Sequence, residues 1–235
     1  MITSKQNETF KRLLKLKKAK YRNQYQEALI FGHDIVEEAL KTNKVIQLIS
    51  TFPHGKNLVF SKDLMDALSD YEMKEPIGAI VSLKEEVLEY KGNVLMCDTI
   101  QDPRNLGALI RSAHAFGFHK IIISKSSADP FHELSIRTSK GSIFHVKIEI
   151  CDLKASIETL KREQYTIIAS SHLEQKVQLK PQHPVALILG NEGHGISDDL
   201  ITLTGRANGS THLAAFAGST ISDNNTIKGA LGELE

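Results

Sequence analysis

Several residues and patterns that would assign a protein to a class are scarce in this sequence. It has 235 residues but only two cysteines, Cys97 and Cys151, and each lies in an apolar stretch, as expected for small core residues in a reducing compartment. The ten histidines form no HxxxH or paired Cys/His pattern, so we expect no metal site. No apolar run approaches ~18 residues, and the N-terminus has no apolar h-region. We therefore expect a soluble, cytoplasmic protein.

Two common nucleotide-binding signatures are also missing. The first strand expected in the C-terminal half is not followed by GxGxxG, so a standard dinucleotide-binding fold is unsupported. The turn at residues 190–197 contains three glycines but has Ile196 where a phosphate-binding loop has its lysine. Glycines at this density indicate a close approach of the backbone or a positive φ. Such a turn suits a ligand that is contacted by backbone groups and carries less negative charge than a triphosphate.

The hydrophobic pattern divides the chain into two α/β blocks. With 41% apolar residues the chain can bury a core, and strand-like runs alternate with helix-like stretches. Residues 83–92 are charged and end in glycine, so we place a linker there, between an N-terminal domain at 1–82 and a C-terminal domain at 93–235. In the second block, short β-branched runs predict a parallel sheet covered on both faces. Strands are expected at 28–31, 45–49, 77–81, 94–97, 120–123, 146–150, 165–169 and 185–189.

The first 25 residues are strongly basic, although the whole chain has a net charge of only +1. They contain eight lysines and arginines against one glutamate. Such a block attracts polyanions, mainly because phosphates release condensed counterions on binding. We favour a nucleic-acid contact. A solvated helix face is the alternative because Phe10 and Leu13 offer apolar surface to bury, and a membrane-surface helix fits less well because the chain has no tryptophan.

Two polar stretches follow strand-like runs in the C-terminal block. In residues 102–117, Asn105 is expected to cap a helix, and Arg111 lies off the apolar stripe of that helix. An ordinary crossover helix with a solvated arginine would show the same periodicity. A second polar turn, at residues 190–195, follows the run at 185–189. We call these two polar turns the corners of the sheet. Open α/β sheets form a ligand crevice between such corners at the ends of their strands.

These corners resemble two motifs of the SpoU/TrmH family of RNA ribose 2'-O-methyltransferases. Residues 102–117 are similar to motif 1, in the pattern DPxNLGAxxRSAxAFG, and residues 189–197 to motif 2, in the pattern LGNEGxGIS. Residues 126–129 and 136–145 resemble the family's middle region. Residues 1–82 resemble its N-terminal substrate-binding domain, which is related to the L30e ribosomal protein fold. The resemblance covers nearly the whole chain.

The resemblance implies an α/β fold with a parallel sheet, a deep C-terminal trefoil knot, and S-adenosylmethionine bound in a bent form. It also implies a homodimer in which both subunits build each active site. The substrate would be structured RNA. A separate N-terminal domain that resembles a ribosomal protein favours ribosomal RNA over transfer RNA.

The resemblance also suggests which residues carry the reaction. Arg111 corresponds to the family's essential arginine. Because a neutral guanidinium is hard to populate, we assign Arg111 as a clamp on a target phosphate that polarises the hydroxyl, and leave the base open. Asn105 would orient the loop or the ribose, and Glu192 would hold Arg111 or a group of the other subunit. Asn224 would fix the motif 3 turn; turn capping is the alternative role for Glu192 and Asn224. The cofactor would be bound by Leu189, Gly190, Asn191, Gly195, Ala214, Phe216, Asp223 and Asn224, and RNA by Lys5, Lys11, Arg12, Arg137 and Lys140.

The stretch that matches motif 3, residues 214–235, departs from the family pattern. Its spacing is intact, but Asp223 stands where the family is apolar, and Ala215 stands where it has proline. A carboxylate at 223 would either attract the sulfonium or amino group of the cofactor or need costly desolvation. Two hypotheses follow. The chain is an S-adenosylmethionine-dependent 2'-O-methyltransferase acting on ribosomal or transfer RNA, or it is an RNA-binding protein that has kept the knot and lost the cofactor.

Overall fold

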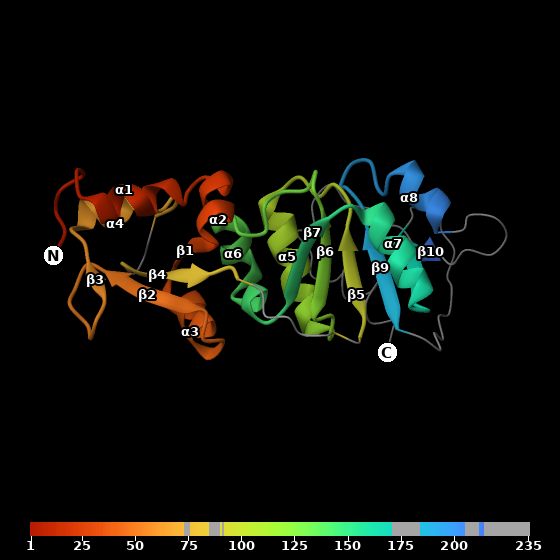
Figure 1. The fold of residues 1–235 in the computed structure, drawn as a ribbon, viewed down its shortest axis with the longest axis horizontal. Helices are drawn as coiled ribbons and strands as arrows, with labels where there is room; N and C mark the ends of the chain where they lie inside the picture. The colour runs from red at the N-terminus through yellow and green to blue at the C-terminus, as the bar shows by residue number, and fades with distance from the viewer. Residues whose placement is uncertain (73–75, 85–89, 91, 171–183, 205–211, 214–235) are drawn as a thin grey trace. The chain divides into compact units, whose positions relative to one another are not determined.

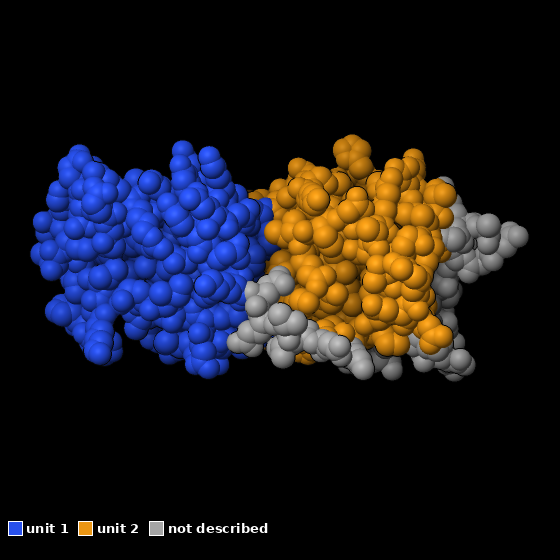
Figure 2. Space-filling view, viewed as in Figure 1, with its two compact units in different colours: residues 1–87, 129–145 blue, residues 88–128, 146–235 orange. Residues whose placement is uncertain are grey.

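The computed structural model of the chain divides into two compact units. Unit 1 comprises residues 1–87 together with 129–145, and unit 2 comprises residues 88–128 together with 146–235 (Figure 2). No helix in the described part of the chain is long and apolar enough to cross a membrane. The described residues are 1–72, 76–84, 90, 92–170, 184–204 and 212–213.

Unit 1 is built on a mixed four-stranded sheet (Figure 1). Its strands are β1 (Glu27–Phe31), β2 (Val45–Ser50), β3 (Leu58–Val59) and β4 (Ile77–Ser82). The strand order is β1-β4-β2-β3; β4 is antiparallel to both of its neighbours, and β3 is parallel to β2. The three longer strands confirm the expected ones. The sequence pattern does not predict β3, because two residues carry no readable periodicity.

The helices of unit 1 bury the apolar side chains of the basic N-terminal stretch. Asn7 caps the first helix, since its side chain accepts a hydrogen bond from the N–H of Phe10 at 3.2 Å. Phe10 and Leu13 are buried in one cluster with Phe60, whereas Leu14 is 40% exposed. The basic stretch therefore has an apolar anchor, and its cations other than Arg22 lie partly or fully exposed. The helices are α1 (Glu8–Lys15), α2 (Ala19–Tyr25), α3 (His33–Lys41), α4 (Lys62–Leu68) and α6 (Glu133–Ser139), followed by a 3-10 turn at Ser142–Phe144.

A buried ion pair ties residues 129–145 into unit 1. Arg22 is only 4% exposed, and its Nε and Nη2 donate to Oδ2 of Asp129 at 3.1 and 2.5 Å. Its Nη1 donates to the carbonyls of Leu16 and Lys17, each at 2.8 Å. A buried guanidinium needs such partners because an uncompensated buried charge is very costly. The segment that the predicted boundaries place in the C-terminal domain thus packs with residues 1–87.

Unit 2 is built on a six-stranded sheet in which every neighbouring pair is parallel (Figure 1). The strand order is β10-β8-β9-β5-β6-β7, and all residues of β5 and β9 are buried. The five longer strands confirm the expected ones to within one residue at each end. The strands are β5 (Val94–Cys97), β6 (Lys120–Ser124), β7 (Lys147–Cys151), β8 (Thr166–Ser170), β9 (Val185–Leu189) and β10 (His212–Leu213), and the helices are α5 (Pro103–Ala115), α7 (Leu153–Arg162) and α8 (Asp198–Leu203).

The strand order places the ends of β5 and β9 side by side. Cys97, the last residue of β5, is in register with Leu189, the last residue of β9, and with Ile123 on the other side. From β5 the chain continues to β6 on one side of β5, whereas β9 pairs with β5 on its other side. The strand order therefore reverses between β5 and β9. Open α/β sheets bind ligands at such a point. Burial raises the pKa of the Cys97 thiol to about 12, so this cysteine is a protonated core residue rather than a nucleophile.

Candidate active site

The helix that carries motif 1, α5, begins at Pro103, and its N-cap is the residue before the proline. Oδ1 of Asp102 accepts a hydrogen bond from the N–H of Arg104 at 2.7 Å, and Asp102 is therefore the N-cap of α5. The expectation that Asn105 caps this helix is wrong. Proline suits the first helical position because it has no N–H to satisfy and its φ is already helical, so the cap must precede it. As the third residue of α5, Asn105 has its side chain available for another contact.

The motif 2 turn folds back on itself directly after β9. The backbone N–H and C=O groups of Asn191 and Gly195 pair with each other at 2.8 and 2.9 Å, and Oδ1 of Asn191 accepts hydrogen bonds from the N–H groups of Gly193 and His194. Gly195 has φ +73°, and a Cβ on Gly190 would lie 2.1 Å from the carbonyl carbon of Gly195. Close approach and positive φ, the two reasons to expect glycine here, are both confirmed.

Direct hydrogen bonds join the two corners. Nδ2 of Asn105 donates to Oε1 of Glu192 at 2.8 Å, and Nδ2 of Asn191 donates to the carbonyl of Thr99 at 2.9 Å. The carboxylate of Asp98, which is 4% exposed, accepts from the N–H of Ser197 at 2.9 Å. The motif 1 and motif 2 loops are therefore held together by side chains on both sides.

A third loop, directly after β6, supports the motif 1 loop from the other side. Ser124 Oγ accepts a hydrogen bond from the N–H of Thr99 at 2.9 Å, and Ser127 Oγ accepts one from the N–H of Ile100 at 3.0 Å. The N–H of Ala128 donates to the carbonyl of Ile100 at 2.7 Å. Thr99 has φ +54°, which is uncommon for a residue other than glycine. Sequence reasoning missed this support, although the serine-rich stretch after a buried strand was its visible signal.

Arg111 lies on α5 and is half-buried. It follows Asn105 by six residues, which corresponds to about 9 Å along a helix axis. The helix thus connects the arginine rigidly to the corner that Asn105 and Glu192 form. The expected partner of Glu192 is Arg111 or a group of the other subunit, and this stays a prediction; among the described residues, Asn105 donates a hydrogen bond to Glu192.

The expected RNA-contacting residues all lie in unit 1. Lys5 is exposed, Lys11 pairs with Glu8 at 3.0 Å, and Arg12 pairs with Glu27 at 2.5 Å. Other cations of the same stretch lie beside an aromatic ring. The ammonium groups of Lys15 and Lys20 are each 5.8 Å from the centroid of the Tyr21 ring. Basic residues interleaved with aromatic rings are typical of surfaces that bind single-stranded nucleic acid.

The other two expected RNA contacts, Arg137 and Lys140, lie at the end of α6 and are exposed. Four further predicted site residues, Ala214, Phe216, Asp223 and Asn224, lie outside the described residues. In the ranges that are described, no group of three or more histidine, cysteine, aspartate or glutamate side chains is arranged to hold a metal ion.

Comparison with known proteins identifies the family. Residues 92–207 match the family model described as the SpoU rRNA Methylase family. The chain is 31% identical over 216 residues to the 23S rRNA (guanosine(2553)-2'-O)-methyltransferase RlmP of Bacillus subtilis strain 168, covering 86% of this chain and 87% of that protein. The chain belongs to the SpoU methylase family. A putative TrmH family tRNA/rRNA methyltransferase of Staphylococcus saprophyticus is 26% identical to this SpoU-family chain over 197 residues, 75% of this chain and 78% of its own length.

Solved structures of similar fold cover almost the whole SpoU-family chain. An rRNA methyltransferase from Sinorhizobium meliloti matches with a TM-score of 0.82 at 22% identity, covering 99% of this chain and 95% of that chain. The SpoU methyltransferase AviRb from Streptomyces viridochromogenes, in complex with AdoMet, matches with a TM-score of 0.78 at 20% identity, covering 97% of each. At these identities the likeness establishes the fold.

Proposed function

We propose that this chain transfers a methyl group from S-adenosylmethionine to the ribose 2'-hydroxyl of a nucleotide in structured RNA, with ribosomal RNA as the substrate. The observation that carries this proposal is the hydrogen bond between Asn105 and Glu192. It joins the motif 1 helix to the motif 2 turn at the ends of adjacent strands, where a parallel sheet binds its ligand. The choice of ribosomal RNA rests on the name of the 31% identical relative.

The described half of the crevice fits the cofactor. Its motif 2 turn is held by backbone hydrogen bonds around three glycines and contains no lysine. Glu192 belongs to that turn, and the carboxylate of Asp98 accepts a hydrogen bond from the N–H of Ser197 just after it. Negative charge suits a sulfonium and an amino group. Leu189, Gly190, Asn191 and Gly195 would hold the adenosine, with Ala214, Phe216, Asp223 and Asn224 as further proposed contacts. When bound, the cofactor supplies an electrophilic methyl group.

S-adenosylmethionine held at the motif 2 turn would supply the methyl group to the ribose 2'-oxygen, and the proton of that hydroxyl would be released to solvent water. Arg111 holds a phosphate of the target nucleotide with two N–H donors and polarises the 2'-hydroxyl. It remains protonated throughout, because a guanidinium does not give up its proton near neutral pH. Correct placement of the hydroxyl accounts for much of the rate in such a reaction.

Asn105 and Glu192 act as positioning residues in this proposal. Their hydrogen bond fixes the start of α5 against the motif 2 turn, and so fixes the direction in which Arg111 leaves the helix. Asn224 is assigned to the motif 3 turn. A fixed corner costs no reorganisation when the reaction occurs, which is how preorganised groups accelerate reactions.

Finer features of the proposal follow the family. We assign a C-terminal trefoil knot, a homodimer in which both subunits build each active site, an L30e-like N-terminal domain and a cytoplasmic location. The all-parallel sheet of unit 2 and the mixed sheet of unit 1 support the two-domain assignment. Lys5, Lys11, Arg12, Arg137 and Lys140 are assigned to RNA binding because unit 1 carries the strongly basic N-terminal stretch.

One observation favours a second function. The motif 3 stretch carries Asp223 where the family is apolar, so an RNA-binding protein that has lost the cofactor is the alternative. Transfer RNA is the alternative substrate, because the staphylococcal relative is named for both RNAs.

Two measurements test the proposal. Calorimetric titration with S-adenosylhomocysteine is expected to show binding, and absence of heat and of a thermal shift at millimolar ligand would favour the alternative. Ribosomal RNA and transfer RNA from cells that lack the gene are then incubated with the purified chain and S-adenosylmethionine labelled in the methyl group. We expect label in one ribosomal RNA nucleotide, mapped as a 2'-O-methyl group. Label only in transfer RNA would identify transfer RNA as the substrate in place of ribosomal RNA. Label in neither RNA would contradict the enzymatic function.

A further inference from the structure

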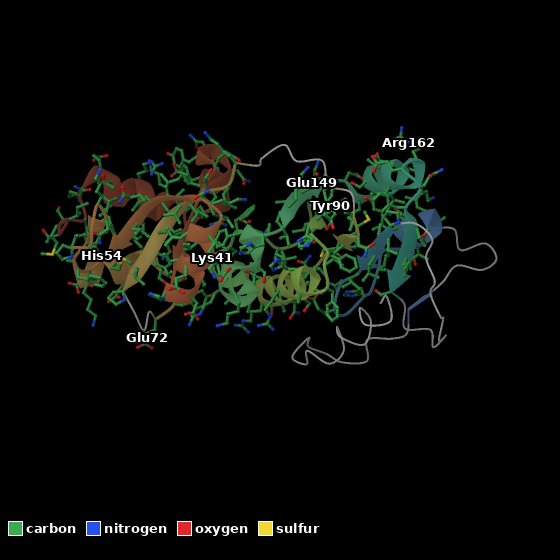
Figure 3. All side chains as sticks on the ribbon, turned by 90° about the horizontal axis from the view of Figure 1, so that it is seen from below. Lys41, His54, Glu72, Tyr90, Glu149 and Arg162 are labelled. Atoms are coloured by element: carbon green, nitrogen blue, oxygen red, sulfur yellow. The ribbon has the colours of Figure 1, made fainter. Side chains whose placement is uncertain are left out.

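Unit 1 contains a pocket to which the proposed reaction assigns no role. Its volume is about 340 Å³, within the range of small-ligand sites. Its walls come from β1, the first turn of α3, the loop that follows α4, and α6. Glu72, which lines the pocket, projects from the loop after α4 (Figure 3).

One side of α6 supplies both polar and apolar groups to this pocket. Glu133, Ile136 and Arg137 line it at spacings of three and four residues, which place them on the same side of the helix, and Lys140, the C-cap of α6, lines it as well. Ile136 lies with Leu29 and Phe31 of β1 in the lining, and all three are buried. The pocket therefore has an apolar wall between charged groups.

Two cations, Arg137 and Lys140, line the pocket together with the carboxylates of Asp34, Glu72 and Glu133. Within the described residues, neither Arg137 nor Lys140 forms an ion pair. The guanidinium carbon of Arg137 lies 5.7 Å from the centre of the Tyr71 ring. Stacking of this kind uses the flat face of the guanidinium and leaves its N–H edge for an anion. The cations therefore offer a site for a phosphate.

The carboxylate of Glu133 is held in a fixed orientation. Its Oε1 accepts a hydrogen bond from Ser69 Oγ at 2.5 Å, and its Oε2 accepts one from the N–H of Asp70 at 2.8 Å. Each carboxylate oxygen has a second lone pair, so Glu133 can still accept a hydrogen bond from a ligand. The carboxylate of Glu133 can therefore accept a hydrogen bond from the amino group of an aromatic ring, while the apolar wall contacts the face of that ring.

We propose that this pocket binds one unpaired ribonucleotide of the RNA substrate. Arg137 and Lys140 bind its phosphate, the apolar wall of Leu29, Phe31 and Ile136 contacts the base, and Glu133 accepts a hydrogen bond from an amino group of adenine, cytosine or guanine. RNA is favoured over a free metabolite because the same unit carries the strongly basic N-terminal stretch. This assignment rests on the proposed RNA substrate. It predicts a substrate with an unpaired nucleotide outside the methylation site.

The test uses the full-length chain and nucleoside monophosphates as probes, with binding followed by NMR. CMP should bind more tightly than UMP, because uracil has a carbonyl where cytosine has an amino group. The variant R137Q/K140N should weaken CMP binding about tenfold or more, since it removes two hydrogen bonds to a charged group. Asparagine is chosen at 140 because Lys140 has φ +51°, which asparagine tolerates. The matched control K56Q/K62Q removes two exposed lysines elsewhere in unit 1 and should leave binding unchanged.

A measurement on the unmodified chain avoids any doubt about folding of the variants. In protein labelled on isoleucine methyl groups, CMP should shift the signals of Ile30, Ile35 and Ile136, which line the pocket, and leave those of the exposed Ile46 and Ile150 in place. Three results would each overturn the pocket assignment. The first is that only other isoleucines shift, and the second is that CMP and UMP bind equally well. The third is that R137Q/K140N and the control bind CMP with the same affinity.

Methylation assays separate this inference from the proposed function. If the chain methylates ribosomal RNA but R137Q/K140N binds that RNA and CMP as the control does, the pocket assignment falls and the function stands. If the chain methylates no RNA but still binds CMP through Arg137 and Lys140, the proposed function falls and the pocket stands as a nucleotide site.

Discussion

The crevice of unit 2 and the charged surface of unit 1 hold their polar groups in different ways. In unit 2, the loops after β5, β6 and β9 are joined by hydrogen bonds such as those of Asn105 to Glu192 and Asn191 to Thr99. In unit 1, the basic residues of the N-terminal stretch other than Arg22 lie partly or fully exposed, and Lys11 and Arg12 pair with single carboxylates. A methyl transfer needs fixed geometry, whereas a phosphate chain needs positive charge in adaptable positions. The contrast assigns chemistry to one unit and RNA retention to the other.

The largest expected effect is that of removing Arg111. We predict that Arg111→Ala lowers the methyl-transfer rate by about 10²–10³-fold, as expected when a charge-stabilising donor is removed. Cofactor binding should be retained, because the arginine is assigned to the RNA. Arg104→Ala is the matched control, since Arg104 lies on the same helix and is exposed. Equal turnover of the two variants would remove Arg111 from its role and break the contrast between the units.

The next effect concerns stability and lies in unit 1. Asp129→Ala leaves the guanidinium of Arg22 buried without its carboxylate, so the free energy of unfolding should fall by about 3–5 kcal/mol. Asp70→Ala is the control, because its ion pair with Lys17 is partly exposed, and its removal should cost at most about 1 kcal/mol. The double variant R22M/D129L should regain much of the stability. Urea denaturation of the four proteins measures these differences, and equal stability of Asp129→Ala and Asp70→Ala would contradict the buried pair.

The smallest effect concerns the cations beside Tyr21. The variant K15Q/K20Q should weaken binding of single-stranded RNA, and the slope of log affinity against log salt should become shallower by about 0.7 for each phosphate that the protein no longer neutralises. Binding measured across a salt series, with K56Q/K62Q as the control, gives this slope. An unchanged slope would show that these lysines do not contact phosphates and belong to a solvated helix face, which is the alternative given for the N-terminal stretch.

The sequence was sufficient for most of the fold because the strands are continuous apolar runs. β5 and β9, with every residue buried, can be recognised from composition alone. Residues 129–145 show the limit of such patterns: Asp129 pairs with Arg22, 107 residues away, and no local periodicity reveals that pairing.

The candidate site shows the same limit on a smaller scale. The strand order and the motif resemblance predicted that the two corners meet. The local helix pattern wrongly placed Asn105 at the cap, and neither argument found its hydrogen bond to Glu192. The supporting roles of Asp98 and Ser124 depend on loop geometry at the strand ends, which a linear pattern does not contain.

The buried thiol of Cys97 provides a built-in reporter for the centre of unit 2. It is fully buried with its pKa raised to about 12, so a thiol reagent can modify it only when β5 separates from its neighbours. In a Cys151→Ser variant, which removes the partly exposed second thiol, the labelling rate measures how often this part of the sheet opens. A small molecule seated at the ends of β5 and β9 should slow that labelling, so occupancy of the crevice can be followed without RNA and without turnover.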